Sequence, residues 1–122
     1  MSLAEIVQRG WDALGAGDFD TLVADYVDDM IFVMPGQSDI LEGRDAFRSA
    51  LDGLGDILPP GFEITDLRLI EQGSEVVSIL EWKSEKISAS QLSVLFKFNG
   101  DKIIEERHIT NKSRRCATRT LY

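Results

Sequence analysis

The chain has 122 residues and a mass of 13.6 kDa, with 43% hydrophobic and 28% charged residues and a formal charge of -8 at pH 7. This length predicts a single domain over residues 1–122 that ends in a basic tail, 112–122. Charged residues or glycine interrupt every apolar run before the roughly 20 residues of a membrane span, and the acidic balance argues against nucleic-acid binding. The acidic start lacks the features of a secretion signal, and a single cysteine excludes an intrachain disulfide, so we expect a cytoplasmic protein.

The first half of the chain carries the periodicity of helices. Apolar residues lie three or four positions apart along residues 3–15, which predicts a helix that ends at Gly15 and Gly17. Asp18 is placed to cap a second helix over 18–27, with Tyr26 facing inward, and a turn is expected at residues 28 and 29. Three further segments follow in order: a strand over 30–36, a loop over 36–43, and a third helix over Arg44–Leu58 that ends at the Pro59-Pro60-Gly61 stretch.

The second half of the chain changes to strand character. Four segments are predicted to be strands: Phe62–Gln72, Glu75–Ser84, Ser88–Asn99 and Lys102–Asn111. Short turns separate them, and Asn99-Gly100 is the strongest hairpin signal in the chain. The order of elements predicts an α+β fold in which helices cover one face of a curved antiparallel sheet.

Alternation along the strands indicates which side chains face inward. The more apolar sets of the two middle strands are assigned to the inner face: Val76, Ser78, Leu80 and Trp82, and Leu92, Val94, Phe96 and Phe98. In the last strand both sets mix apolar and polar residues, so alternation alone does not choose between them. The outer sets include Val77, Ile79, Leu95 and Ile109. Such a face is too apolar to be fully solvated, which predicts a homodimer through the outer face of the sheet.

Three stretches of the sequence resemble the nuclear transport factor 2-like superfamily. They are VQRGWDALGAGDFDTLVADYVDD, the glycine of LEGRDAF, and FNGDKIIEERHITN. The chain is most similar to the SnoaL-like polyketide cyclase and ketosteroid isomerase branches. This resemblance implies a cystatin-like cone, in which a curved antiparallel sheet wraps around three N-terminal helices. It also implies a deep apolar pocket and, as is usual in these proteins, a homodimer.

The same resemblance argues against ketosteroid isomerase activity. That family uses an Asp base and an oxyanion hole formed by a Tyr and a protonated Asp. The matching positions of this chain hold Met34, Gly10 and Val94, respectively. None of these side chains can transfer a proton or stabilise an enolate.

The cyclase branch implies one catalytic candidate. SnoaL-like proteins end their last strand in a pattern like GKIVEHWDV, whose aspartate is the acid/base group, and the corresponding DKIIEERHI places His108 there. Histidine can do the same work because it exchanges protons near neutral pH. The alignment turns His108, Glu106 and Thr110 into the pocket. The alternatives are a histidine that is exposed or bonded for structure, and a Glu106 paired across strands at the surface.

The candidate catalytic residues are therefore His108, with Glu106 or Asp39 as its helper. Asp39 lies in a loop expected over the pocket mouth, although Gly-Gln-Ser-Asp is also ordinary turn composition. The candidate ligand-contacting residues, several of which are equally consistent with core, are Trp11, Tyr26, Phe32, Met34, Trp82, Val94, Phe96 and Thr110. One histidine and one cysteine make no convincing zinc site, and no metal or organic cofactor is expected.

Two functions remain open. The first is binding of a small hydrophobic molecule in the pocket together with cofactor-free acid–base isomerisation or cyclisation. The second is a non-catalytic ligand-binding or dimerisation module. An open cavity of several hundred Å³ with His108 and a carboxylate at its wall favours the enzyme, whereas a collapsed cone with His108 against backbone acceptors favours the module.

Overall fold

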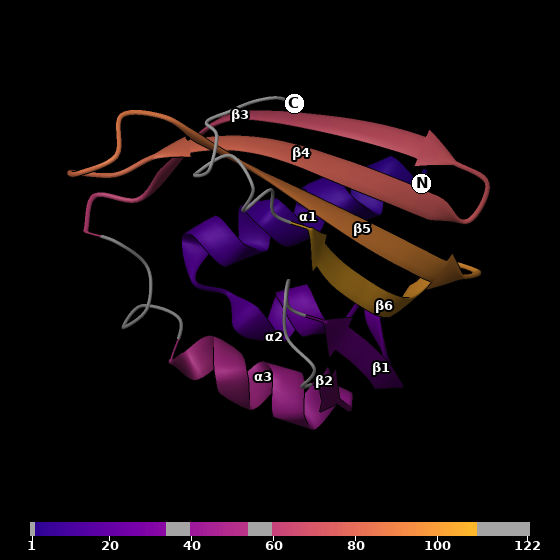
Figure 1. Ribbon diagram of the computed structural model, residues 1–122. Helices are drawn as coiled ribbons and strands as arrows, with labels where there is room; N and C mark the ends of the chain where they lie inside the picture. The colour runs from indigo at the N-terminus through magenta and orange to yellow at the C-terminus, as the bar shows by residue number, and fades with distance from the viewer. Residues whose placement is uncertain (1, 34–39, 54–59, 110–122) are drawn as a thin grey trace.

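The computed structural model describes residues 2–33, 40–53 and 60–109, and Figure 1 shows their α+β arrangement. Within these ranges the elements are, in chain order, α1 (Leu3–Ala16), α2 (Phe19–Val23), β1 (Tyr26–Val33), β2 (Ile40–Glu42), α3 (Arg44–Asp52), β3 (Glu63–Gln72), β4 (Glu75–Lys83), β5 (Ser90–Asn99) and β6 (Lys102–Ile109). The predicted fold class is confirmed. No helix in the described ranges combines the length and the apolar character that crossing a membrane requires.

Helix α1 begins at a complete capping box. The Ser2 hydroxyl accepts a hydrogen bond from the Glu5 backbone N–H at 3.1 Å, and the Ser2 backbone N–H donates to Glu5 Oε1 at 2.7 Å. The helix buries Ile6 and Val7 against the sheet and ends at Gly17, whose φ of 74° is left-handed. The helix predicted over 3–15 is thus confirmed.

The predicted second helix is too long. Helix α2 ends at Val23, and Tyr26 is already the first residue of β1, so that Asp28 and Asp29 lie within a strand rather than a turn. The reason is tertiary: β1 pairs in parallel with β6, and the sheet hydrogen bonds outweigh the local helical spacing of this segment.

Two boundaries after β1 also differ from prediction. Residues Ile40–Glu42, expected in a loop, form the short edge strand β2, antiparallel to β1 with Phe32 opposite Leu41. Helix α3 ends at Asp52, followed by Gly53, instead of continuing to Leu58. Residues 54–58 of the predicted helix lie outside the described residues.

The described sheet has the strand order β2-β1-β6-β5-β4-β3. Strands β3 to β6 form the predicted antiparallel meander, and the hairpin at Asn99-Gly100 joins β5 to β6. In Figure 1 the long strands β3, β4 and β5 pass over α1, and the sheet bends through β6 to β1 beside α2 and α3. Helix α1 contacts β3 and β4, whereas α3 contacts β1 and β2.

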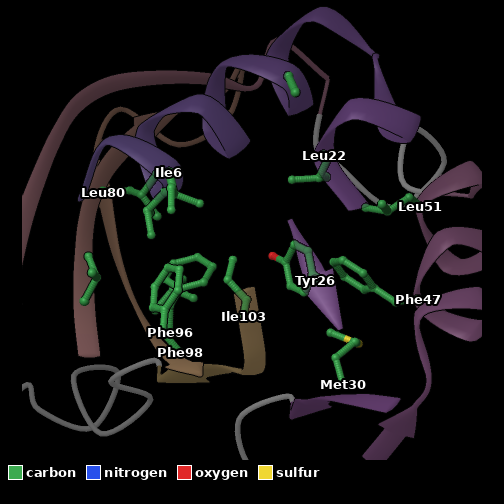
Figure 2. Close-up of a cluster of buried hydrophobic side chains, with 14 residues drawn as sticks. Ile6, Leu22, Tyr26, Met30, Phe47, Leu51, Leu80, Phe96, Phe98 and Ile103 are labelled. Atoms are coloured by element: carbon green, nitrogen blue, oxygen red, sulfur yellow. The ribbon is translucent and has the colours of Figure 1, made fainter. Parts of the chain in front are cut away.

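The inner face assigned from alternation is the buried face. Val76, Ser78 and Val94 are fully buried, and Phe96 and Phe98 are 4% exposed. Figure 2 shows Leu80, Phe96 and Phe98 of the sheet on the same side as Ile6 of α1, with Leu22, Leu51 and Phe47 of the other helices across from them. The core therefore lies between the concave face of the sheet and all three described helices.

The left-handed residue after α1 provides a test of this fold. We expect Gly17→Ala to lower the free energy of unfolding by about 1 kcal/mol, because an L side chain adopts this conformation only under strain. Gly15 lies two residues earlier, inside α1, and Gly15→Ala should instead raise the free energy of unfolding by about 0.5–1 kcal/mol because alanine has the higher helix propensity. An added Cβ meets no atom within 4 Å at either site, so backbone conformation alone separates the two variants. Urea unfolding of both proteins measures the difference, and shifts of the same sign would contradict it.

Candidate functional site

A cavity of about 340 Å³ lies inside the cone. Its wall is mostly apolar and includes Trp11, Leu14, Leu22, Phe47, Leu51 and Phe96. Four ionisable side chains among the described residues also line it: Asp25, Tyr26, Glu106 and His108. A concave apolar site with a few convergent polar groups is the usual form of a small-molecule site.

Three of these polar side chains form a chain of hydrogen bonds. The Tyr26 hydroxyl donates to Glu106 Oε1, and His108 Nε2 lies 2.7 Å from Glu106 Oε2. Tyr26 lies on β1, whereas Glu106 and His108 are two residues apart on β6 and therefore share one face. The parallel pairing of β1 with β6 brings the three side chains together.

Burial keeps the Tyr26 hydroxyl protonated. The side chain is 2% exposed, and this burial raises its pKa well above the ordinary value for a tyrosine. The negative charge of Glu106 raises the pKa further, as does the hydrogen bond to that carboxylate. Tyr26 is thus a neutral phenol that donates to Glu106, and both oxygens of this 6% exposed carboxylate have a partner.

The bond to Glu106 also orients His108. A carboxylate only accepts hydrogen bonds, so the ring hydrogen belongs on Nε2 and the neutral imidazole keeps its lone pair on Nδ1. The ring packs against Phe32, with centroids 4.9 Å apart and planes tilted by 52°. Among the described residues no group bonds Nδ1, and His108 is one of the residues that line the cavity.

Asp25 is the fourth polar group of the cavity wall, and neither it nor its partner Arg9 was predicted from the sequence. The guanidinium donates twice, from Nη2 to Oδ1 at 2.6 Å and from Nε to Oδ2 at 3.2 Å. Asp25 is 8% exposed, and this bidentate pair compensates its charge. The sequence predicts a helix at this position, and no local sequence signal indicates a pair that spans α2, from α1 to the start of β1.

The structure places the predicted site residues in three groups. His108, Glu106, Trp11, Tyr26, Phe32 and Phe96 line the cavity. Trp82 and Val94 face inward but are not among the residues that line it: the Trp82 ring packs on Phe62 at 5.3 Å, and Val94 is covered by core side chains. Met34, Asp39 and Thr110 lie outside the described residues, as does the basic tail. Within the described ranges no three His, Cys, Asp or Glu side chains gather as a metal site would need.

Residues 7–106 of the chain match the model of the SnoaL-like domain family. No curated protein matches the sequence. A solved structure of a proposed polyketide cyclase from Pseudomonas putida KT2440 is 16% identical over 93% of this chain and 94% of that one, with a TM-score of 0.75. Bal32a, from a soil-derived mobile gene cassette, is 22% identical over 90% and 89%, with a TM-score of 0.76. A cystatin-fold protein from Novosphingobium aromaticivorans is 24% identical over 89% and 98%, with a TM-score of 0.71. These similarities confirm the predicted cystatin-like fold.

The raised pKa of Tyr26 predicts how stability changes at high pH. An unfolded chain ionises tyrosine near pH 10, whereas the folded chain holds the Tyr26 proton to higher pH. The contribution of this proton to the free energy of unfolding is therefore complete below pH 10 and is lost as the pH rises above it. The loss reaches at most about 1.4 kcal/mol per pH unit for one group. Urea unfolding between pH 9 and about 11 should show a steeper decline for the natural protein than for Tyr26→Phe. The comparison uses the slopes, because the variant also loses a hydrogen bond at every pH. Equal slopes would contradict a buried neutral phenol.

Proposed function

The chain belongs to the SnoaL-like domain family, and we propose that it binds a small hydrophobic molecule in its cavity and catalyses a cofactor-free acid–base isomerisation or cyclisation. The observation that carries the proposal is the hydrogen bond between His108 and Glu106 at the wall of an apolar cavity of about 340 Å³. This arrangement provides a proton acceptor, a group that stabilises its charged form, and walls that exclude water.

The proposed reaction begins with proton transfer to His108. Nδ1 takes a proton from a carbon next to a carbonyl, and the electron pair of the broken C–H bond moves into an enolate. The imidazolium forms 2.7 Å from the Glu106 carboxylate. The carboxylate stabilises its positive charge, as the aspartate of a Ser-His-Asp triad does for the triad histidine. When a C=C bond of the ligand is conjugated with this enolate, returning the proton to the far carbon of that bond shifts the double bond and completes an isomerisation. If the enolate carbon instead attacks a second carbonyl, the imidazolium protonates the new alkoxide and a ring is closed.

A non-catalytic ligand-binding module is the second candidate function. The observation in its favour is that Tyr26 and Glu106 direct their polar atoms at each other and at His108, as a purely structural network does. In addition, Gly10 lines the cavity where the isomerase branch carries its oxyanion tyrosine. The two functions differ in whether the bound molecule is converted.

Identification of the ligand is the first experiment. Native mass spectrometry of the purified protein would identify a co-purified small molecule, and incubation with it would show whether it is converted. We expect His108→Ala to lower turnover by two to four orders of magnitude, the usual contribution of one general acid–base group. Arg107→Ala is the matched control, because Arg107 is the exposed neighbour on the same strand, and it should keep full turnover. Binding without conversion by the natural protein would favour the module.

We also propose a homodimer through the outer face of the sheet. Support comes from apolar residues that the register places side by side: Ile70 beside Val77, and Val77 beside Leu95. Ile70 is 48% exposed and Ile109 is 49% exposed on the same face. Mixed, partly apolar faces of this kind commonly form self-complementary interfaces.

Sedimentation at micromolar concentration tests the assembly. The natural protein should sediment at twice the chain mass of 13.6 kDa. Ile79→Lys, which adds a charge in the middle of the outer face, should shift the population to monomer. Ala16→Lys adds the same charge at the exposed end of α1 and should leave the dimer intact. A natural protein that sediments only as a monomer would overturn the proposal.

A further inference from the structure

We infer that the cavity selects compact, mostly apolar molecules that carry a hydroxyl or a protonated amine, and that it rejects the matching carboxylates. This inference rests on the proposed function and names the class of ligand for the same site. It follows from the charges that face the cavity and from the size of the space.

The charge balance of the cavity wall is negative whenever His108 is neutral. Two of its described ionisable residues are the acids Asp25 and Glu106, both less than 10% exposed. Arg9 neutralises Asp25 through two hydrogen bonds. Among the residues that the structure describes, no lysine or arginine pairs with Glu106, whose partners are His108 and the neutral Tyr26. The Glu106–His108 pair is therefore negative when the imidazole is neutral and uncharged when it is protonated.

With a neutral His108, a bound carboxylate would meet this charge with no free lysine or arginine among the described residues to offset it. Two like charges about 6 Å apart, at the effective dielectric of about 20 that suits protein sites, repel enough to change affinity about 100-fold. A protonated amine would gain from the same field. A hydroxyl would be accommodated because Nδ1 of a neutral His108 accepts a hydrogen bond.

The volume restricts the ligand further. About 340 Å³ is at the lower end of the roughly 300–1,000 Å³ that small-molecule pockets span. The remaining wall is apolar and aromatic, with Trp11, Phe32, Phe47 and Phe96 among its members. One ring or two fused rings with a single polar substituent fits this combination of size and chemistry.

Four probes with one ring system and different substituents test the inference. They are naphthylmethanol, naphthylmethylamine, naphthamide and naphthoate, titrated into the natural protein at neutral pH by calorimetry. We expect the alcohol, the amine and the amide to bind, and naphthoate to bind about 100-fold more weakly than naphthamide, which has nearly the same shape without the charge. This comparison needs no variant and is unaffected by any folding defect.

Two variants assign the selectivity to one carboxylate. Glu106→Gln removes the charge at nearly constant volume and should bring naphthoate and naphthamide within about threefold of each other. Glu105→Gln removes the same charge from the adjacent outer-face residue, which pairs with Lys97 and Arg107, and should keep the natural selectivity. If all four probes bind the natural protein equally, or naphthoate binds best, the inference is overturned while the proposed binding function stands. If no probe binds, the proposed binding function fails and the inference fails with it.

Discussion

The two hydrogen bonds to Glu106 place one buried carboxylate between a distant strand and a neighbour on its own strand. Tyr26 reaches this carboxylate from 80 residues away, and His108 reaches it from the same strand. Leaving a buried carboxylate without one of its donors costs several kcal/mol, so the fold is most stable when β1 lies beside β6 with Tyr26 facing inward. The parallel pairing of these strands, the wall that they form and the orientation of the His108 ring all depend on satisfying this one charge.

The cavity exists because the helices cover the two ends of the sheet rather than its middle. Helix α1 packs on β3 and β4, and α3 packs on β1 and β2. Where α1 meets the sheet, Val76 and Leu80 are almost fully buried, and the interior is filled. Phe96 of β5 and Ile103 of β6 instead face the space between the helices, and they line the cavity. The curved sheet (Figure 1) therefore carries a packed core and a cavity along one continuous inner face.

Local signals predicted the meander and its inner face, because alternation and the Asn99-Gly100 turn act over a few residues. They failed for the segment around Tyr26, where helical spacing continues but a strand 80 residues away supplies the hydrogen bonds. They also missed the pairing of Arg9 with Asp25, which depends on how the chain turns back. Trp82 shows a further limit. Alternation predicts which face of the sheet a side chain occupies, but not which part of that face the cavity adjoins, and Trp82 is on the inner face without lining the cavity.

The structural role of Glu106 is compatible with the catalytic role that we propose for it. In the proposed reaction, a neutral His108 beside the carboxylate would leave one uncompensated negative charge in a largely apolar wall before proton transfer. Transfer of a proton from a ligand to Nδ1 turns this pair into a neutral one and places an imidazolium next to the enolate that forms. The stabilisation is thus larger in the charge-separated state than in the ground state, which is the condition for an interaction to accelerate a reaction. An anionic substrate would instead place a second negative charge near this carboxylate before proton transfer, and the two charges would repel each other. The carboxylate that joins β1 to β6 through Tyr26 is therefore also the group that, in the proposed reaction, would favour proton removal from uncharged ligands.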